Sequence, residues 1–470
     1  MENKYQQDFN LTQWVNEFEI LTQQGEKTCF DIRIYQKLIE YYQSEGDLKK
    51  AVEVAESALE QYGYRVDFYL SKSRLLLSLK QPLEAMDCLH QAERLSPQDT
   101  EILLTKALIL SDLKDRDIAL ALLHDMKIYV GQSDLVDVLT TEVQIRFMGE
   151  EYDKGFIILK DALRINPYHE KGQQLLSEYT SSSRNYQSIA KFLQEMLENA
   201  PYSHFAWYNL GHCYSNLNEY AKAIDAFEYA YLIKPEFQQA YIDCADTCIL
   251  LCQYDKALAI YHEVLNTFGE EYDLMITIAE CCLHLKDTRQ AKKYLNQCLK
   301  LDMFGEEVHF LMGQCFAIEE KWHKAIQSYR RAISIDDTSD VYFLSLAKAY
   351  AQIGEIDKAA RNFKKATNCA PEQNSYWFAY ASFLLKQGKI QQALDVLDQG
   401  ELSAVGSDLL YCRAAIYYIL GNKTKSIDIL AEVLEDDFNS HIEMFELAPE
   451  MESDRDIISI INYYKGELFE

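Results

Sequence analysis

The residues with the greatest potential for chemistry in this chain are its cysteines, of which there are twelve. Cys244, Cys248 and Cys252 are spaced by four residues, and Cys281 and Cys282 follow in the next stretch of similar sequence. A structural zinc site needs four converging ligands, usually supplied by two closely spaced pairs. A spacing of four instead places thiols on one face of a helix, where small apolar side chains pack. We therefore predict buried free thiols, no metal site and no cofactor.

The sequence lacks the short motifs that carry catalysis. It contains no H-E-x-x-H, no G-x-S-x-G and no glycine-rich loop for phosphate or a dinucleotide. Its ten histidines are scattered, and carboxylates are so abundant that pairs of them carry no information. We therefore predict that the protein is not an enzyme, with a metal- or thiol-dependent enzyme as the remote alternative.

The charge balance restricts the kind of partner. The formal net charge is −28, with aspartate and glutamate in nearly every part of the chain. Such a surface repels phosphate backbones, so we predict no direct nucleic-acid partner. The acidity either keeps a long surface in solution or favours a basic partner, and the sequence leaves both explanations open.

The ends of the chain give no sign of export or membrane insertion. The first ten residues are polar, and no apolar run reaches 18 residues. Together with the predicted free thiols, which suit a reducing compartment, this favours a cytoplasmic location.

A small residue recurs every 34 positions, and this period defines the elements that must position any site. The two irregularities are Ile189, which interrupts the series, and Ser426, which arrives one residue early. The series, with a two-residue slip before Gly155, is Ala51, Ala85, Ala119, Gly155, Ala223, Ala257, Ala291, Ala325, Ala359 and Ala393. Such a period indicates a stack of one supersecondary unit, because a single unit cannot bury its own apolar face.

Each unit reads as two antiparallel helices. In the unit that starts at His204, the apolar and small residues of positions 4, 7, 8 and 11 share one helix face, and those of positions 17, 20, 24 and 27 share another. They are Trp207, Leu210, Gly211 and Tyr214, followed by Tyr220, Ala223, Phe227 and Ala230. Asn218 marks the turn between the helices, and Pro235 ends the second one. Small residues at position 8 oppose large ones at position 24, which predicts close helix packing.

These residues, W-x2-L-G-x2-Y followed by A-x3-F-x2-A and a closing proline, resemble the tetratricopeptide repeat (TPR), whose unit also has 34 residues. The resemblance covers about Ile32 to Ser440 in twelve units. Their starts are Ile32, Val66, Thr100, Val136, Glu170, His204, Gln238, Tyr272, Glu306, Asp340, Asn374 and Ser407. The resemblance implies an all-α fold, a right-handed α-solenoid (TPR superhelix) of helix-turn-helix repeats with capping helices at both ends.

The sequence predicts four segments: an amino-terminal cap over 1–31, repeats 1–3 over 32–135, repeats 4–12 over 136–440 and a carboxy-terminal cap over 441–470. Trp14, Phe18 and Leu21 predict one capping helix after Thr12, and a final helix is expected over Ile457–Tyr464, entered through Ser453 and Asp454. The loop around Gly131–Asp134 is two residues too long, and Gly400–Gly406 is one too short, so we expect small breaks in stacking at both places.

The resemblance also implies a binding surface. In TPR arrays, positions 2, 5, 9, 12 and 13 of the first helix face the concave side. Position 5 is apolar from the sixth unit onward, with further apolar residues at position 12 and mixed charges at position 9. The predicted groove residues are Tyr208, Ile242, Ile276, Phe310, Leu344, Phe378 and Tyr411 at position 5, Tyr418 at position 12, and Asp246, Glu280 and Lys348 at position 9.

An exposed apolar strip of this kind is typical of a site for an apolar segment. We therefore predict a non-catalytic protein–protein interaction scaffold that binds a peptide or helical segment, apolar or basic, of a protein partner. Two alternatives stay open: neighbouring side chains cover the strip, or the chain self-assembles into a homo-oligomer. The lysine and asparagine with which some TPR domains hold chaperone tails do not recur here, which argues against that ligand.

Overall fold

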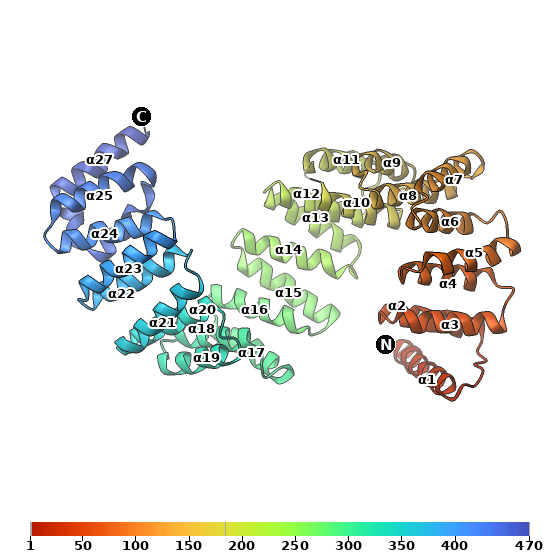
Figure 1. The fold of residues 1–470 in the computed structure, drawn as a ribbon, viewed down its shortest axis with the longest axis horizontal. Coiled ribbons are helices and arrows are strands. Elements are labelled where there is room, and N and C mark those ends of the chain that lie inside the picture. Colours follow the sequence, from red (N-terminus) through yellow and green to blue (C-terminus); the bar gives the residue numbers. More distant parts are fainter. Residues whose placement is uncertain (1, 184, 470) are drawn as a thin grey trace. The chain divides into compact units, whose positions relative to one another are not determined.

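The computed structural model describes the backbone of residues 2–183 and 185–469, and the side chains of residues 11–183 and 185–465. Within these residues every regular element is a helix. Helices α2 to α25 form consecutive hairpins, each made of an even-numbered first helix and an odd-numbered second helix. Helix α1 precedes the hairpins, and α26, α27 and two short 3₁₀ helices follow them (Figure 1).

The first helices are α2 (Ile32–Ser44), α4 (Val66–Ser78), α6 (Thr100–Asp112), α8 (Gln132–Met148), α10 (Glu170–Ser182), α12 (His204–Asn216), α14 (Gln238–Leu250), α16 (Tyr272–His284), α18 (Glu306–Ile318), α20 (Asp340–Gln352), α22 (Asn374–Lys386) and α24 (Ser407–Ile419). The second helices are α3 (Leu48–Gln61), α5 (Pro82–Leu95), α7 (Arg116–Tyr129), α9 (Tyr152–Ile165), α11 (Tyr186–Asn199), α13 (Tyr220–Ile233), α15 (Tyr254–Phe268), α17 (Thr288–Leu301), α19 (Trp322–Ile335), α21 (Ile356–Cys369), α23 (Ile390–Ser403) and α25 (Lys423–Asp436).

The predicted unit starts coincide with the first residue of a helix everywhere except at Val136. There the helix α8 begins four residues earlier, at Gln132, with Gly131 as its N-cap. The predicted long loop at Gly131–Asp134 is therefore wrong, because the two extra residues lengthen the helix. The missing residue near Gly400–Gly406 is instead taken from the connection, since α23 keeps its usual length and ends at Ser403.

Both caps are helical, and one prediction needs correction. Helix α1 runs from Glu2 to Gln24 and so begins well before the predicted start after Thr12. Its described side chains Val15 and Phe18 are buried in one cluster with Tyr42 of α2. At the other end, α26 (Ile442–Leu447), a 3₁₀ helix (Pro449–Ser453) and α27 (Arg455–Phe469) follow α25, and the carboxylate of Asp454 accepts a bond from the backbone N–H of Asp456 as α27 begins. Met444 and Met451 are fully buried there.

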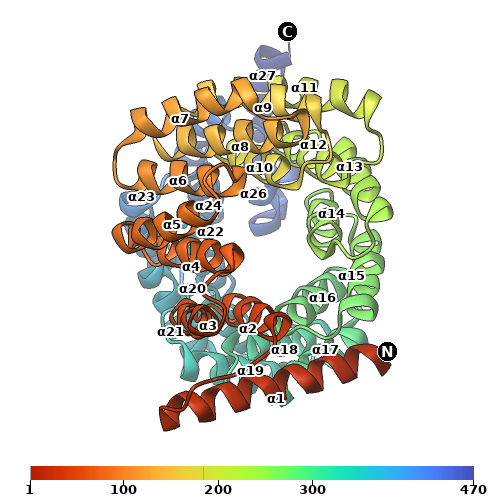
Figure 2. The ribbon, with the colours of Figure 1, turned by 90° about the vertical axis from the view of Figure 1, so that its right-hand side faces the viewer.

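The chain divides into two compact units, Met1–Thr247 and Cys248–Glu470, with the division inside α14. In the first unit, the hairpins stack in chain order, and Figure 2 shows α8 and α10 on the inner side of the curve with α9 and α11 outside them. In the second unit, consecutive hairpins from α16 onward pack in the same order (Figure 1).

The turn inside each hairpin whose position 15 is described by the structure uses a left-handed residue there. Its φ is positive at Gly46, Gly354, Gly388 and Gly421, and also at Lys80, Lys114, Glu150, Asn218, Cys252, Lys286 and Glu320. Left-handed backbone is strained by roughly 1 kcal/mol for a residue with a Cβ. The repeat therefore imposes this conformation even on residues that disfavour it.

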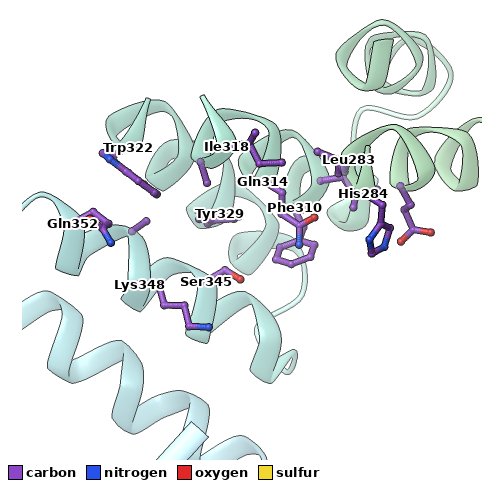
Figure 3. Close-up of a pocket in the computed structure, with 14 residues that line it drawn as sticks. Leu283, His284, Phe310, Gln314, Ile318, Trp322, Tyr329, Ser345, Lys348 and Gln352 are labelled. Atoms are coloured by element: carbon purple, nitrogen blue, oxygen red, sulfur yellow. The ribbon is translucent and has the colours of Figure 1, made fainter. Parts of the chain in front are cut away.

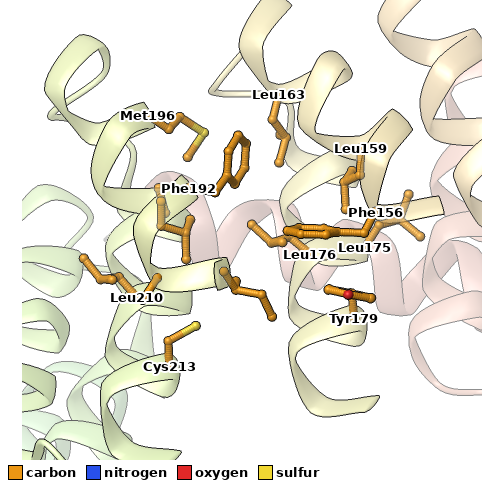
Figure 4. Packing of buried hydrophobic residues seen from close by; sticks show 14 of the residues in the cluster. Phe156, Leu159, Leu163, Leu175, Leu176, Tyr179, Phe192, Met196, Leu210 and Cys213 are labelled. Atoms are coloured by element: carbon orange, nitrogen blue, oxygen red, sulfur yellow. The ribbon is translucent and has the colours of Figure 1, made fainter. Parts of the chain in front are cut away.

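The buried core forms clusters that join helices of neighbouring repeats. One cluster joins α8 to α13, with the Phe156 and Tyr179 rings stacked at 4.3 Å beside Phe192 and Leu210 (Figure 4). Helices approach closely where a glycine faces a large ring. A Cβ on Gly211 would lie 2.6 Å from Phe227, and one on Gly313 would lie 2.4 Å from Tyr329. The predicted opposition of a small position 8 and a large position 24 is confirmed at these two contacts.

Ion pairs connect neighbouring repeats at two carboxylates, the buried Glu142 and the half-buried Glu319. Glu142 of α8 pairs with Lys127 and Arg146. Glu319, directly after α18, pairs with Lys292 and Lys321, and it also accepts a bond from Thr288. Hydrogen bonds from these partners lower the pKa of Glu319 from 4.5 to about 2. The carboxylate stays ionised at neutral pH and holds α17 against α18.

Candidate functional site: a pocket on the first helices of the second unit

A pocket of about 590 Å³ lies in the second unit, between α16, α18, α19 and α20 (Figure 3). Three predicted groove residues line it: Glu280 from α16, Phe310 from α18 and Lys348 from α20. Leu283, His284, Gln314, Ile318, Ser345 and Gln352 complete much of the wall from the same first helices. Equivalent positions of three successive first helices thus converge on one hollow.

The pocket has an aromatic floor. Phe310 is 8% exposed, with its ring centroid 5.7 Å from that of Tyr329 and 4.8 Å from that of Tyr342. Gly313, one turn along α18, lets the Tyr329 ring approach the backbone. Trp322 of α19 adds a second large ring to the lining. Such a surface favours an apolar side chain of a ligand, because aromatic faces bury large areas at little conformational cost.

The two charged groups of the pocket, Glu280 and Lys348, differ in how deeply they are buried. Glu280 is half-buried, and burial together with the nearby carboxylate of Glu307 raises its pKa. No salt bridge or hydrogen bond joins its carboxylate to another described side chain. Lys348 is exposed across the pocket. A half-buried carboxylate without a cation is stabilised by an incoming ammonium or guanidinium group.

The other predicted groove residues of the second unit do not line this pocket, and they differ in burial. Ile276 is 7% exposed, and Tyr411 is completely buried with its hydroxyl donating to the backbone carbonyl of Asp437. Tyr418 is half-buried and donates to Asp454 at 2.9 Å. Leu344 and Phe378 are half-buried. Tyr411 is therefore a core residue, because the carboxy-terminal cap covers it, and the prediction that it lines a groove is wrong.

In the first unit, Tyr208 belongs to a polar and aromatic cluster on α12. It is half-buried, its hydroxyl donates to Asp243 at 2.7 Å, and its ring lies 4.8 Å from that of Phe237. Asp243 also accepts from His212 at 3.1 Å. Ile242 is half-buried and Asp246 exposed on α14. Tyr208 is thus committed to contacts within its own unit.

Two pocket residues were not predicted to be there. Tyr329 occupies position 24 of its unit, a position that the sequence predicts to pack against the first helix, and Trp322 occupies position 17. The recurrence of aromatic residues at position 17, as in Tyr220, Tyr254 and Trp322, is the sequence signal that points to the latter. The role of Tyr329 depends on Gly313 opposite it, which exposes the ring edge to the pocket.

The cysteines are free thiols, and those at packing positions are buried. Cys244, Cys248, Cys281 and Cys282 are buried, whereas Cys252 is exposed in a turn. Burial raises the pKa of Cys213 and of Cys315 to about 12, so these thiols stay protonated at neutral pH. Among the described residues, no group of three histidine, cysteine or carboxylate side chains has the geometry to hold a metal ion. None of the described helices combines the length and apolarity that crossing a bilayer requires.

The fold and the pocket define an α-solenoid of helical hairpins with a recessed surface on its first helices. Models of the tetratricopeptide repeat match this chain over residues 204–237, 253–315 and 344–407. The chain is 21% identical over 366 residues to the TPR repeat-containing protein YpiA of Bacillus subtilis, and the aligned region covers 76% of this chain and 84% of that protein. It is 19% identical over 244 residues to anaphase-promoting complex subunit 3 of Schizosaccharomyces pombe, covering 52% of this chain and 37% of the relative.

The crystal structure of a tetratricopeptide repeat protein from Parabacteroides merdae is similar, with 14% sequence identity and a TM-score of 0.42. The superposed region covers 52% of this chain and 98% of that protein's chain. The 34-residue period, the positions where the helices start and the matches to family models all indicate the same helical repeat. The chain contains tetratricopeptide repeats over the matched residues and resembles bacterial proteins of this family. Proteins of this family generally bind other proteins or scaffold their assembly.

Proposed function

We propose that this protein is a non-catalytic interaction scaffold whose second unit holds a segment of a protein partner in the pocket on α16, α18 and α20. The observation that carries the proposal is the combination of an aromatic floor at Phe310 and Tyr329 with the half-buried, unpaired carboxylate of Glu280. The ligand it suits is a segment with an aliphatic or aromatic side chain next to lysine or arginine. The apolar side chain covers the rings, and the cation neutralises Glu280.

The charge of the whole chain supports the same polarity. With a net charge of −28, the protein attracts basic segments at long range, and the pocket supplies short-range contacts. Lys348 stands on the far helix of the pocket, so a carboxylate of the partner placed there fixes the direction in which the segment lies.

The test is selection from a library of random peptides displayed on phage against the intact protein. We expect enrichment of peptides that place an apolar residue beside lysine or arginine, and we expect Glu280→Gln to weaken their binding about tenfold or more, as for loss of a half-buried charge pair. Glu263→Gln on α15 is the matched control, since Glu263 is an exposed carboxylate on a second helix. Lys348→Glu should change which peptides are enriched.

Glu280→Gln is a better probe than Phe310→Ser. Phe310 is nearly buried, and its removal leaves a cavity that costs roughly 3–5 kcal/mol. A weakened binder with a damaged fold would say nothing about the pocket, whereas the amide of glutamine keeps the shape of the glutamate side chain. If the selected peptides bind Glu280→Gln and Glu263→Gln equally well, the proposed pocket is wrong.

A further inference from the structure

A second groove in the same unit is lined by cations and by no carboxylate. It has a volume of about 600 Å³ and lies between the second helices α19 and α21, with α20 beneath them. Its floor is apolar, formed by Ile333, Phe343, Leu346 and Tyr350. Four cations line it, namely Arg330, Lys358, Arg361 and Lys365, and no carboxylate belongs to its lining. It shares no lining residue with the pocket at Phe310.

These cations are exposed and have little to neutralise them. Lys358 pairs with Glu355 at 3.2 Å. Arg361 donates only to the backbone carbonyl of Asp357, and Lys365 lies 4.9 Å from the centre of the Phe343 ring. No carboxylate in the described part of the chain lies within salt-bridge distance of Arg330, Arg361 or Lys365. In a chain with a net charge of −28, such a concentration of unpaired cations is a local exception.

The two helices that border the groove are themselves poor in acidic residues. The α19 sequence WHKAIQSYRRAISI contains no acidic residue, and Arg331 and His323 line a smaller hollow next to Arg330. The α21 sequence IDKAARNFKKATNC has a single acidic residue, Asp357, against four cations. Like charges held close together repel one another, so the cluster lowers the stability of the free protein unless an anion neutralises it.

The corresponding groove elsewhere in the chain shows that the cluster is not a property of the repeat. Between α11 and α13, the same repeat positions form a groove of about 470 Å³, in the first unit. There Gln194 stands in the place of Arg330, Glu198 in the place of Ser334 and Asp225 in the place of Arg361, while Lys222 corresponds to Lys358. The two grooves share an apolar floor from positions 4, 7 and 11 of the first helix and differ in charge. The fold thus accepts uncharged and acidic residues at these positions.

We propose that the groove between α19 and α21 binds an acidic segment of a protein, in which carboxylates flank an apolar side chain. The apolar side chain covers Phe343 and Leu346, and the carboxylates pair with Arg330, Arg361 and Lys365. A protein segment fits better than a nucleic acid, because the acidic remainder of the chain repels a polyphosphate beyond this one groove. The inference is independent of the pocket at Phe310, which suits a basic segment.

The experiment uses the full-length chain and a fluorescein-labelled synthetic peptide in which glutamates flank one leucine, followed by fluorescence anisotropy at an ionic strength of about 0.05 M. The double variant R330Q/R361D places the residues of the α11–α13 groove at two exposed positions, so circular dichroism should be unchanged. We expect it to bind the peptide about tenfold more weakly, because it loses two cations and gains one carboxylate. Raising the salt concentration should weaken binding to the unaltered protein.

The reciprocal variant Q194R/D225R tests the charge pattern by gain of binding. It should add a second, weaker site between α11 and α13, because Glu198 remains there and Tyr229 stands in the place of Lys365, seen as additional bound peptide at saturation. Probes with a lysine-for-glutamate peptide, a single-stranded oligonucleotide and phosphatidylserine vesicles complete the comparison. The proposal is overturned if R330Q/R361D binds the acidic peptide as well as the unaltered protein does. It is also overturned if only the oligonucleotide or the vesicles bind through Arg330 and Arg361.

Discussion

Two tryptophans at the same repeat position make a matched test of how the stack is stabilised. Trp377 on α22 and Trp207 on α12 both occupy position 4 of their units, and each indole N–H donates to a proline carbonyl six residues earlier at 2.8 Å. They differ in burial: Trp377 is 6% exposed, whereas Trp207 is half-buried beside a surface groove. Gly400 lets the Trp377 ring sink deeper, since a Cβ on that glycine would lie 2.9 Å from the indole.

The magnitudes follow from these environments. A fully buried tryptophan removes about 200 Å² from water, worth roughly 5 kcal/mol at about 25 cal/mol per Å². Subtracting roughly 1 kcal/mol for the alanine that replaces it, and adding about 1 kcal/mol for the lost hydrogen bond, gives about 4–5 kcal/mol for Trp377→Ala. Trp207→Ala should cost less, roughly 3–4 kcal/mol, because part of its surface is already in water. From the sequence alone we would expect about 3–5 kcal/mol for Trp207, and its partial exposure lowers that value.

The assay is urea unfolding combined with hydrogen exchange measured by mass spectrometry. Contacts in a solenoid are between neighbours, so Trp377→Ala should increase exchange in α20 to α25 and leave α2 to α10 unchanged. Trp207→Ala should increase exchange in α10 to α13 and leave α20 to α25 unchanged, with a smaller effect. Equal losses of stability in the two variants, or exchange that rises evenly along the chain, would refute this account of the packing.

Four further substitutions have expected outcomes. Glu320 and Gly354 both adopt a left-handed backbone conformation in a turn, with φ of 57° and 76°. Glu320→Gly should therefore stabilise the second unit by about 0.5–1 kcal/mol, and Gly354→Ala should destabilise it by about 1 kcal/mol. The urea midpoints of the two variants measure both effects. Gly313→Leu should cost roughly 1–3 kcal/mol by overpacking, because even a Cβ at this position would lie 2.4 Å from the Tyr329 ring. Thermal unfolding measures this loss of stability. The lowered pKa of Glu319, about 2 against 4.5 when unfolded, makes its stabilisation complete above about pH 4.5 and lost as pH falls toward 2. Allowing for its partial exposure to solvent, we expect Glu319→Gln to remove about 1–2 kcal/mol of that acid-side dependence, seen as a flatter stability curve between pH 5 and pH 2.

Each of these has an outcome that contradicts it. The turn prediction is wrong if the glycine at 320 lowers the urea midpoint. The packing prediction is wrong if neither Gly313→Leu nor Gly313→Ala changes the melting temperature. The ion-pair prediction is wrong if the glutamine variant at 319 and the unaltered protein lose stability in parallel as the pH falls.

The sequence by itself determined the period, the helix pairs and their starts. The small residues of position 20 and position 8, with the large residues of position 24, specify where two helices meet, and both kinds of contact depend only on residues within one or two units. Prolines such as Pro235 and Pro371 ended helices where predicted, since their rings stop the hydrogen-bond ladder. The sequence could not show whether an insertion would lengthen a loop or a helix, and at Gln132 it lengthened the helix.

The tertiary structure decided which predicted groove residues are accessible. Position 5 reads as apolar from Tyr208 to Tyr411, yet Phe310 lines a pocket whereas Tyr411 is buried by the carboxy-terminal cap. Exposure depends on which neighbour stands opposite, and that neighbour comes from another helix. The basic groove at Arg330 and Arg361 was missed for a similar reason: its cations come from two second helices and lie 28 or more residues apart in the sequence, and the total charge conceals them. A one-dimensional pattern specifies contacts within a repeat, while a site is made by side chains from several repeats meeting at one place.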